Sequence, residues 1–552
     1  MIIQIAALPL FVPFAAALSH DGRSAGERLS ERAAAKKVAI IGAGAAGSSA
    51  AFHLAQYARE ADIPTQIDVY ERSSHVGGRS TTISPWDYPQ YSVELGASIF
   101  VEVNHILMNA SRDFGLRTAT RTVHDDEGMA DLAIWNGNEF VYTMTDEGGW
   151  WDMAKLFWRY GYAPVKTNSL MKDTVGKFLR LYEKPLFPFK SLSQAVQDVG
   201  LVEVTGLTGE QFLKNKGVAD LFANEIIQAS TRVNYASNLG SIHGVETMVC
   251  MAANGAMQIE GGNWKIFDNM LSSSSSISTH LQTTITHISK QPNGTYVLTL
   301  PTGDTKTFDQ VILASPLQFS NLVIDPAPAH VPDQIPYVNL HVTHFATPLK
   351  LSPAAFNLAP EAQVPQAILT TIPATESYPH NGTTFNGSPG FFSISILKSL
   401  INPRSSTARQ EYIYKIFSDE PVSAAFLSKY LGVKVTSDEI EGKADPDANV
   451  SWIHHKLFQS YPHELPRLTF EELKLDEGLW YTSGIESFIS TMETSALMGR
   501  NVARLIADNF VGGKDGWGVE DTEERQRAFE WKYGGLQQPA GQQPMHEREG
   551  VH

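Results

Sequence analysis

The sequence of 552 residues contains a single cysteine, Cys250, so no intrachain disulfide can form. The apolar stretch around it, TMVCMAA, is typical of a buried and inert thiol. The sequence also lacks an HExxH motif, a CxxC motif and a recognisable Ser-His-Asp set. We therefore expect stability to come from a hydrophobic core, and we predict no metal site.

Positive charge is scarce as well. The chain has 43 basic against 59 acidic residues, a formal net charge of -16, which argues against nucleic acid as a partner. The remaining composition, 43% apolar and 10% aromatic, is that of a globular enzyme. A chain of this length exceeds what one core usually organises, so we predict two or more domains.

The N-terminus is apolar from Ile2 to Leu18 except for Gln4, too short for an ordinary membrane span, and it ends in small residues. We predict a signal peptide over residues 1–17, a flexible lead over 18–36, and no membrane span in the mature chain. A short anchor is the alternative, because the basic n-region is missing. The predicted location is the secretory pathway, with the protein secreted or delivered to a lysosome or vacuole. Five sequons, which also arise by chance, agree with this route: Asn109, Asn293, Asn381, Asn386 and Asn449.

Ordered structure is expected to begin with a βαβ unit. Val38 to Ile41 is predicted as a buried parallel strand, Ser48 to Arg59 as a helix, and Gln66 to Glu71 as a second strand. The glycines of the GAGAAG turn have separate steric roles. Gly42 permits the tight turn, Gly44 lets the backbone approach a pyrophosphate, and Gly47 lets the helix pack on the strand. The helix N-terminus then attracts phosphate without a basic side chain.

The residues after the second strand favour FAD over a nicotinamide cofactor. Glu71 lies where a carboxylate accepts hydrogen bonds from both ribose hydroxyls. The stretch SSHVGGR then places Gly78 and Arg79 within reach of the same pyrophosphate, a second clamp that a nicotinamide domain does not generally need. We also assign the neighbouring Arg72 to the cofactor site.

The pattern further along predicts a discontinuous first domain. Strand-like stretches within 278–300 and 310–314 and a strand-to-helix run over 479–506 indicate returns to the nucleotide-binding fold. Between them lie an aromatic helical region and a region in which the alternating pattern of Phe391 to Leu397 predicts a sheet. The predicted boundaries are 37–125, 250–320 and 475–511 for the FAD-binding domain, 126–249 and 321–474 for the substrate or cap domain, and 512–552 for a partly disordered tail.

Several stretches together resemble a known family. VAIIGAGAAGSSAAFHL, IDVYERSSHVGGRS and VELGAS are similar to the amine-oxidase type of FAD-binding fold. LFWRYGY, TRVNY, EGGN, YKIFSDE, YPH and WYTSGIESFISTMETSA resemble the prenylcysteine oxidase family, also called the prenylcysteine lyase family. This resemblance implies an α/β protein, with a Rossmann-like FAD-binding domain of the amine-oxidase and GDP-dissociation-inhibitor type and an interleaved α+β substrate or cap domain.

The resemblance also implies positions for the cofactor. Gly42, Gly44, Gly47, Glu71, Gly78 and Arg79 would hold the adenosine diphosphate part, and Ile285 would meet the adenine. Gly484 and the helix opening around Thr491, with Met492 and Glu493, would lie beneath the flavin ring. A helix N-terminus there would stabilise negative charge on the reduced ring.

The activity implied by the resemblance is cleavage of farnesyl- or geranylgeranyl-cysteine to cysteine, a prenyl aldehyde and hydrogen peroxide, with oxygen as the acceptor. Oxidation at the allylic carbon next to sulfur needs few catalytic side chains, because apolar walls position the substrate and exclude water. Trp158 and its aromatic neighbours are candidate tunnel walls, although core packing of a cap helix explains them too. Arg232 and Asn234, with the adjacent Tyr235, are candidates for the polar end of the substrate. His463, in the stretch SWIHHKLFQSYPHELP that we expect to be loop-like, is the candidate catalytic side chain, with a structural histidine as the alternative.

Two rival functions stay open. One is an oxidase of the same fold that acts on an amine or on another allylic or isoprenoid substrate. The other is a carrier that binds prenylated peptides without chemistry, like the GDP-dissociation inhibitors. The sequence leaves the oligomeric state open.

Overall fold

The computed structural model describes residues 34–120, 130–144, 156–253 and 255–512. The predicted signal peptide (1–17), nearly all of the predicted lead (18–36) and the tail beyond residue 512 lie outside the described residues. The same is true of Trp150 and Trp151 in the aromatic stretch.

The strand predicted at Val38 to Ile41 is β1, near the middle of a six-stranded sheet with the order β20-β21-β13-β1-β2-β9. β1 pairs in parallel with β2 and β13, so that Ile40 lies opposite Val69 and Ile312, all three fully buried. Near-continuous apolar runs are expected in such strands because helices cover both faces of a parallel sheet. The strands are β1 (Lys36–Ile41), β2 (Thr65–Tyr70), β9 (Ile277–His280), β13 (Gln310–Leu313), β20 (Lys474–Asp476) and β21 (Leu479–Tyr481).

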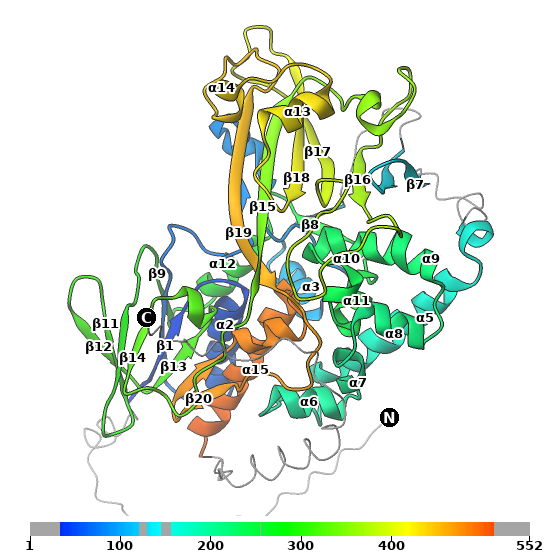
Figure 1. Ribbon diagram of the computed structural model, residues 1–552. Coiled ribbons are helices and arrows are strands. Elements are labelled where there is room, and N and C mark those ends of the chain that lie inside the picture. The colour runs from blue at the N-terminus through cyan, green and yellow to red at the C-terminus, as the bar shows by residue number, and fades with distance from the viewer. Residues whose placement is uncertain (1–33, 121–129, 145–155, 254, 513–552) are drawn as a thin grey trace, which may run out of the picture. The chain divides into compact units, whose positions relative to one another are not determined.

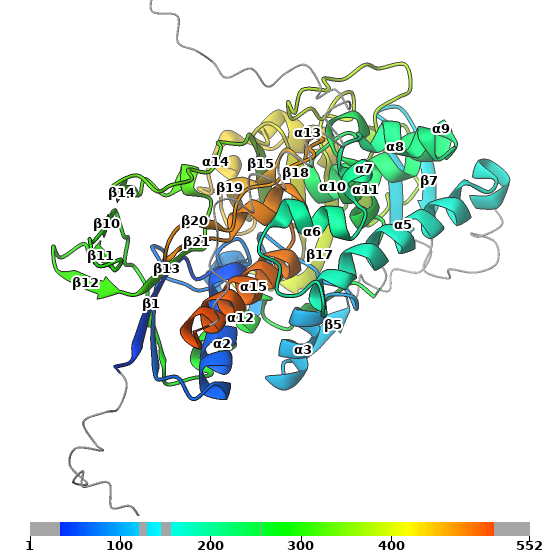
Figure 2. The same cartoon turned by 90° about the horizontal axis from the view of Figure 1, so that it is seen from below.

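Two helices from opposite ends of the chain pack against each other beside this sheet. α2 (Ala45–Glu60) and α15 (Met492–Phe510) lie side by side in two views (Figures 1 and 2). Their contact is close because a Cβ on Gly499 would lie 2.1 Å from the Ala46 carbonyl oxygen. The Ser49 hydroxyl donates to the Ala496 carbonyl oxygen across it, at 2.6 Å. The helices α3 (His105–Asp113) and α12 (Trp264–Ser272) belong to the same region.

A four-stranded sheet extends from this domain, in the order β12-β11-β10-β14. Its strands are β10 (His287–Lys290), β11 (Tyr296–Thr299), β12 (Thr305–Phe308) and β14 (Val323–Asp325). Because β14 pairs with β10, this sheet continues past the boundary that we placed at residue 320. Similarly, β20 begins at Lys474, just before the boundary placed at 475.

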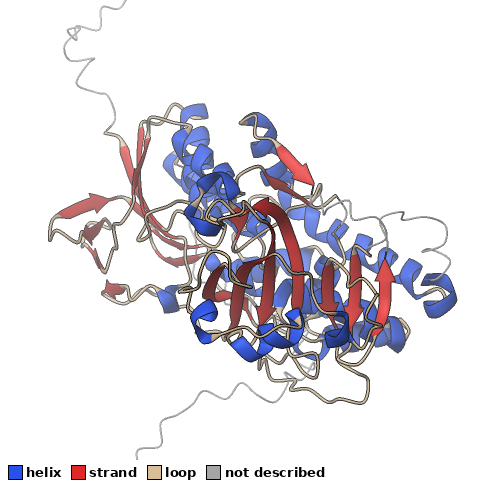
Figure 3. Cartoon of the chain, turned by 90° about the horizontal axis from the view of Figure 1, so that it is seen from above, coloured by secondary structure: helices blue, strands red, loops and turns tan. Residues whose placement is uncertain are grey.

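The second large sheet has seven strands in the order β19-β15-β18-β17-β16-β6-β7, and Figure 3 shows it as a row of long arrows. Its strands are β6 (Leu132–Trp135), β7 (Phe140–Met144), β15 (Tyr337–Thr347), β16 (Ala367–Thr370), β17 (Ser393–Ile401), β18 (Gln410–Ser418) and β19 (Trp452–Pro462). The short helices α13 (Ala424–Leu431) and α14 (Ser437–Ile440) lie between β18 and β19 in sequence. This region contains the sheet that the alternating pattern near Phe391 predicts.

One prediction here is wrong. The stretch SWIHHKLFQSYPHELP, which we expected to be loop-like, contains the whole of β19. β19 is an edge strand whose pairing with β15 runs along most of its length. The ladder of backbone bonds therefore supplies its stability, and its many polar side chains conceal the strand in the sequence.

Helices fill the described part of the chain between β7 and β8. They are α5 (Ala163–Leu179), α6 (Leu192–Asp198), α7 (Val202–Thr205), α8 (Gly209–Asn215), α9 (Asp220–Phe222), α10 (Gln228–Tyr235) and α11 (Gly244–Cys250). α8 starts with a capping box, in which Thr208 and Gln211 satisfy each other's backbone amides. Two short pairings complete the description: β3 (Thr82–Ile83) with β4 (Val93–Glu94), and β5 (Thr118–Thr120) with β8 (Met257–Ile259).

Candidate functional site

The glycine turn after β1 has no room for a side chain at Gly42 or at Gly47. Gly42 adopts φ of +110°, and a Cβ there would lie 2.9 Å from the Ala314 carbonyl oxygen. A Cβ on Gly47 would lie 1.9 Å from the Gly42 carbonyl oxygen. α2 then begins after Gly44 with no side chain capping its first amides. The positive end of the helix dipole is therefore available to an anion in the space beside the turn.

Glu71 closes this cradle on the other side, immediately after β2. Its carboxylate accepts the backbone amides of Ala43, at 2.9 Å, and Ser73, at 2.8 Å. The backbone carbonyl of Glu71 accepts the amide of Thr283, which brings Ile285 to the same wall. The glycine turn, Glu71 and the segment around Ile285 thus meet around one space, as a dinucleotide site requires.

The second glycine pair packs directly on the first turn. Gly44 and Gly77 form a β-bridge, and a Cβ on Gly78 would lie 3.2 Å from the Gly44 Cα. Gly78 also has φ of +59°, a left-handed conformation that glycine adopts without strain. Backbone therefore approaches backbone here, and the loop of SSHVGGR forms a second edge of the cradle.

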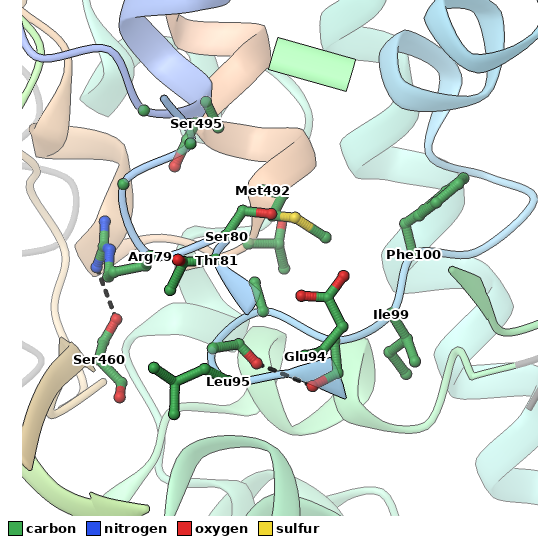
Figure 4. Close-up of a pocket in the computed structure, with 18 of the residues that line it drawn as sticks. Arg79, Ser80, Thr81, Glu94, Leu95, Ile99, Phe100, Ser460, Met492 and Ser495 are labelled. Atoms are coloured by element: carbon green, nitrogen blue, oxygen red, sulfur yellow. Dashed lines mark hydrogen bonds between the residues drawn. The ribbon is translucent and has the colours of Figure 1, made fainter. Parts of the chain in front are cut away.

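A single cavity of about 1680 Å³ joins this cradle to the seven-stranded sheet. Ordinary small-molecule pockets measure roughly 300–1,000 Å³, so this space is large enough for a dinucleotide and a second ligand. Its walls include the glycine turn, the start of α15, the cavity-facing ends of α5, α10 and α11, and strands of the seven-stranded sheet. Figure 4 shows part of it, from Ser495 on α15 to Glu94 and Phe100.

Arg79 lines the cavity but its guanidinium is engaged by protein groups. Nη1 and Nη2 each lie 2.8 Å from a carboxylate oxygen of Glu486, and Nη1 also donates to the Ser460 carbonyl oxygen at 2.6 Å (Figure 4). The structure therefore does not show the Arg79 side chain in the phosphate-binding geometry that we predicted. Arg72 lines the cavity as well, and it donates to the Phe319 carbonyl oxygen at 3.1 Å. Sequence reasoning missed Glu486, because nothing near it in the chain identifies its partner.

The start of α15 faces the cavity, with Thr491 as its N-cap and Met492 and Glu493 on the lining. The Glu493 carboxylate accepts the amides of Ile106 and Leu107 in the first turn of α3, at 2.8 and 3.0 Å, and also binds the Tyr182 hydroxyl. Burial raises its pKa to about 7. Glu493 thus fixes α3 to α15, which leaves the helix start itself as the feature presented to a ligand. Gly484 does not line the cavity; a Cβ there would lie 2.8 Å from the Glu471 side chain.

Four polar groups on the cavity wall are buried without a hydrogen-bond partner among the described residues. They are the Tyr70 hydroxyl, the Ser80 hydroxyl, one carboxyl oxygen of Glu94 and Nε2 of His454. Buried polar groups without partners are costly, and each calls for a ligand or an ordered water. Together with the glycine cradle, they fit a large ligand that carries both phosphate and further polar atoms, which describes FAD.

The predicted substrate residues divide into two groups. Asn234 and Tyr235 line the cavity, and the Tyr235 hydroxyl donates to the Ser490 carbonyl oxygen at 3.1 Å. Arg232 does not line it. Its fully buried guanidinium donates to Asn238, Thr370 and the carbonyl oxygens of Phe385 and Asn386, so its role is structural. The prediction for Arg232 is therefore corrected: an arginine that is buried by its own fold has no donors left for a substrate.

Trp158 and His463 also lie away from the cavity lining. Trp158 is 94% exposed, while Phe157 and Tyr162 are exposed and Tyr160 packs against Phe222. The aromatic stretch is therefore not the tunnel wall in the described residues. His463 follows β19, where its amide donates to the Pro336 carbonyl oxygen, and burial lowers its pKa to about 4. It is absent from the cavity lining, which removes the geometric basis for a catalytic role.

The cavity does include Cys250, at the end of α11. Burial raises the pKa of its thiol well above the ordinary value, which favours the unreactive protonated form. In the part of the chain that the structure describes, no cluster of His, Cys, Asp and Glu has the arrangement of a metal site. No helix in the described ranges is long and apolar enough to span a bilayer.

Comparison with known proteins agrees with this architecture. Residues 40–130 match the model of an NAD(P)-binding Rossmann-like domain, and residues 143–516, more than half of the chain, match the model of prenylcysteine lyase. The chain belongs to the prenylcysteine lyase family. It is 27% identical to the farnesylcysteine lyase of Arabidopsis thaliana, covering 86% of this chain and 88% of that protein. It is also 27% identical to human prenylcysteine oxidase 1, covering 88% of this chain and 91% of that protein.

A solved structure supports the fold. The cyclohexylamine oxidase of Brevibacterium oxydans aligns with a TM-score of 0.50 and 14% sequence identity, covering 87% of this chain and all of that one. At this identity the likeness speaks for the fold alone. The predicted family and the predicted amine-oxidase type of fold are both confirmed.

Proposed function

We propose that this member of the prenylcysteine lyase family is an FAD-dependent oxidase that cleaves the thioether of farnesyl- or geranylgeranyl-cysteine. The observation that carries the proposal is the continuity of the cavity. One space connects a backbone cradle for a dinucleotide with a wall from α5, α10 and α11 that is rich in apolar side chains. A prenylated amino acid is an amphipathic ligand of the kind that such a wall fits.

The cradle residues would hold the cofactor through backbone groups. Gly42 and Gly44 leave space for the pyrophosphate beside the N-terminus of α2, and Glu71 would receive the ribose hydroxyls. Ile285 would meet the adenine, and the first turn of α15 would lie nearest to negative charge on the ring system. When bound, FAD supplies the acceptor for the hydride removed from the carbon next to sulfur and passes the electrons to oxygen.

The chain's own part in the reaction is to position the thioether and to control water. Phe178 on α5, Val249 on α11 and Ile489 before α15 contribute apolar lining. Such a surface orders the prenyl chain and keeps bulk water from the reacting carbon. Overall, thioether, one water and one oxygen give cysteine, a prenyl aldehyde and hydrogen peroxide, so water must reach the site in controlled amounts.

The same proposal places the protein in the secretory pathway, through cleavage of the signal peptide over residues 1–17. Among the sequons, the side chains of Asn109, Asn293 and Asn381 are exposed, which suits glycan attachment. The side-chain amides of Asn386 and Asn449 instead donate to Asp419 and to the Lys434 carbonyl oxygen. We therefore expect glycans at the first three sites. Mass mapping of the secreted protein after glycosidase treatment tests this order, and glycans confined to Asn386 and Asn449 would contradict it.

The decisive experiment joins a spectrum to an assay. The purified protein should show a bound-flavin spectrum and should release peroxide and cysteine when given farnesylcysteine. Bound, reducible flavin without turnover of farnesylcysteine, but with turnover of an amine or another allylic substrate, would favour a related oxidase. Colourless protein that binds farnesylcysteine after attempted reconstitution with FAD would favour a prenyl-binding carrier.

A further inference from the structure

Four polar residues form a straight row across the seven-stranded sheet where it borders the cavity. Ser395 on β17 pairs directly with Lys415 on β18, Lys415 pairs with His344 on β15, and His344 pairs with His454 on β19. Directly paired residues in a sheet point to the same face. Three members of the row, Ser395, Lys415 and His454, line the cavity. A polar line therefore crosses one wall of a cavity whose helical wall is rich in apolar residues.

This row holds the short strand β4 in place. The main-chain carbonyl oxygen of Glu94 accepts bonds from His344 Nε2 and Lys415 Nζ, both at 3.2 Å. Lys415 Nζ also donates to the Ser98 hydroxyl at 2.9 Å. Burial lowers the pKa of His344 well below its ordinary value, so the ring is neutral and donates through Nε2. The position of the Glu94 backbone is consequently fixed from two strands.

The side chain of Glu94 has one partner and one open position. Oε1 accepts the Asn263 amide at 2.7 Å, while Oε2 has no hydrogen-bond partner among the described residues. The residue is 7% exposed, and in Figure 4 its carboxyl group extends from β4 into the cavity. An unsatisfied carboxyl oxygen is unfavourable in so buried a place. A ligand group that donates a hydrogen bond would remove that cost.

We propose that Glu94 receives the α-ammonium group of the substrate's cysteine and so selects thioethers that carry a free amine. The assignment rests on the proposed function and adds a specificity residue to it. A carboxylate that receives an ammonium group forms a charge-assisted hydrogen bond, the strongest type available to Oε2. An acylated amine would lose the charge and would also place a bulky group against the fixed β4 strand.

The charges around Glu94 set the pH at which it can act. Burial raises the pKa of the Glu94 carboxyl to about 7. The Asn263 backbone amide and the positive charges of Lys415 on β18 and Lys398 on β17 lower this pKa, but burial has the larger effect. Both lysines line the cavity. His344, the further titratable group against it, is neutral. Above about pH 7 the carboxylate is ionised and binds the ammonium group, and below that pH binding should weaken.

The test compares wild-type holoenzyme with E94Q on farnesylcysteine and on N-acetyl-farnesylcysteine. Glutamine keeps an oxygen for the Asn263 amide but lacks the charge. We expect E94Q to raise the KM for farnesylcysteine roughly 10- to 100-fold, the loss expected for one charge-assisted hydrogen bond, and to leave the acetylated substrate nearly unchanged. The matched control is E203Q, which changes an exposed carboxylate outside the cavity, 4.0 Å from Lys216 Nζ. It should leave the KM values unchanged.

Three outcomes would overturn the assignment: equal KM values for the two substrates with the wild type, equal effects of E94Q on both substrates, or loss of flavin from E94Q, which would make the cofactor the partner of Glu94. If E94Q does not fold, the wild type still decides. Its KM for farnesylcysteine should fall as the pH rises through about 7, whereas that for the acetylated compound should not.

A binding measurement distinguishes failure of this proposal from failure of the proposed function. Anaerobic titration of wild-type and E94Q holoenzyme with farnesylcysteine, followed by the flavin spectrum, measures affinity without turnover. A wild type that binds but releases no peroxide would count against the proposed oxidase. Equal affinities of wild type and E94Q would count against Glu94.

Discussion

The two ends of the cavity are built in different ways. At the cofactor end, Gly42, Gly44 and Glu71 come from one continuous βαβ unit, in which no side chain caps the first amides of α2. At the substrate end, Glu94, Ser395, Lys415 and His454 come from four separate strands. Their side chains act through partners far away in the sequence. A backbone site depends on local spacing, whereas a side-chain site depends on which distant groups compete for each donor and acceptor.

Two arginines illustrate the difference. We predicted that Arg79 binds phosphate and that Arg232 binds the substrate carboxylate, from residue type and position. In the fold, the first pairs with Glu486 and the second is enclosed by carbonyl oxygens of the cap. Residue type thus identified charged groups near the right region but did not identify what they bind.

The largest expected effect concerns Arg232, and it tests whether the substrate end was misassigned. Arg232→Met should lower the free energy of unfolding by about 3 to 5 kcal/mol, because several buried acceptors lose their donor. Urea denaturation measures this change in the free energy of unfolding. The control is N234A, a variant at a half-buried position on the cavity wall. A folded R232M protein of normal stability with a KM for farnesylcysteine raised at least tenfold would return Arg232 to the substrate site.

The next effect concerns the cofactor end. Gly47→Ala should abolish flavin binding and lower stability by about 3 kcal/mol, since the new methyl group would overlap the Gly42 carbonyl oxygen. Gly176→Ala is the control, because it lies inside α5 with open space around it. That change should raise stability by about 0.5 to 1 kcal/mol. Flavin absorbance per protein and thermal unfolding measure both variants. Normal flavin content in G47A would contradict the prediction, because it would show that the turn accommodates a methyl group at position 47.

A third prediction concerns buried acids behind the substrate end. Burial raises the pKa of Glu246 on α11 to about 8, and that of Glu464 is raised as well. A carboxyl with a raised pKa stays protonated in the folded state while the unfolded chain ionises near its model value of 4.5. The free energy of unfolding should therefore fall as the pH rises from about 4.5 to about 8, by at most roughly 1.4 kcal/mol per pH unit for one proton.

Glu246→Gln should flatten this slope, because the amide does not ionise. Urea denaturation of both proteins at pH 5, 6.5 and 8 measures it. Parallel pH profiles for wild type and E246Q would exclude Glu246 as the source, and would direct the same experiment to Glu464.

The smallest effect concerns Trp158, which the sequence suggests as a wall of the substrate tunnel but which is exposed to solvent in the fold. Trp158→Ala should change the free energy of unfolding by less than about 0.5 kcal/mol and should leave the KM for farnesylcysteine unchanged. Phe178→Leu, on the buried side of α5 at the cavity, is the control, and its smaller side chain should alter the KM. A tenfold rise in the KM of W158A would bring the aromatic stretch back into the substrate tunnel.

Much of the fold could be read from patterns near each residue. The βαβ unit, the hairpin around the turn at Asn293, the strand ending at Leu313 and the strand-to-helix run into α15 all appear where the sequence predicts them. The edge strand β19 could not be read in this way, since its partner β15 lies more than a hundred residues earlier and its own side chains are polar. The bond between Arg79 and Glu486 likewise joins distant segments.

By itself, the sequence determined the backbone cradle and, through it, the class of cofactor, while stretches elsewhere in the chain indicated the family. Glycine spacing has that power because a side chain on Gly47 would overlap the Gly42 carbonyl oxygen, only five residues earlier. The tertiary structure alone decided which charged side chains remain available to a substrate, since partners from distant segments satisfy Arg232 and leave one buried oxygen of Glu94 without a partner. A guanidinium whose N–H donors are all used within the fold has none left for a ligand.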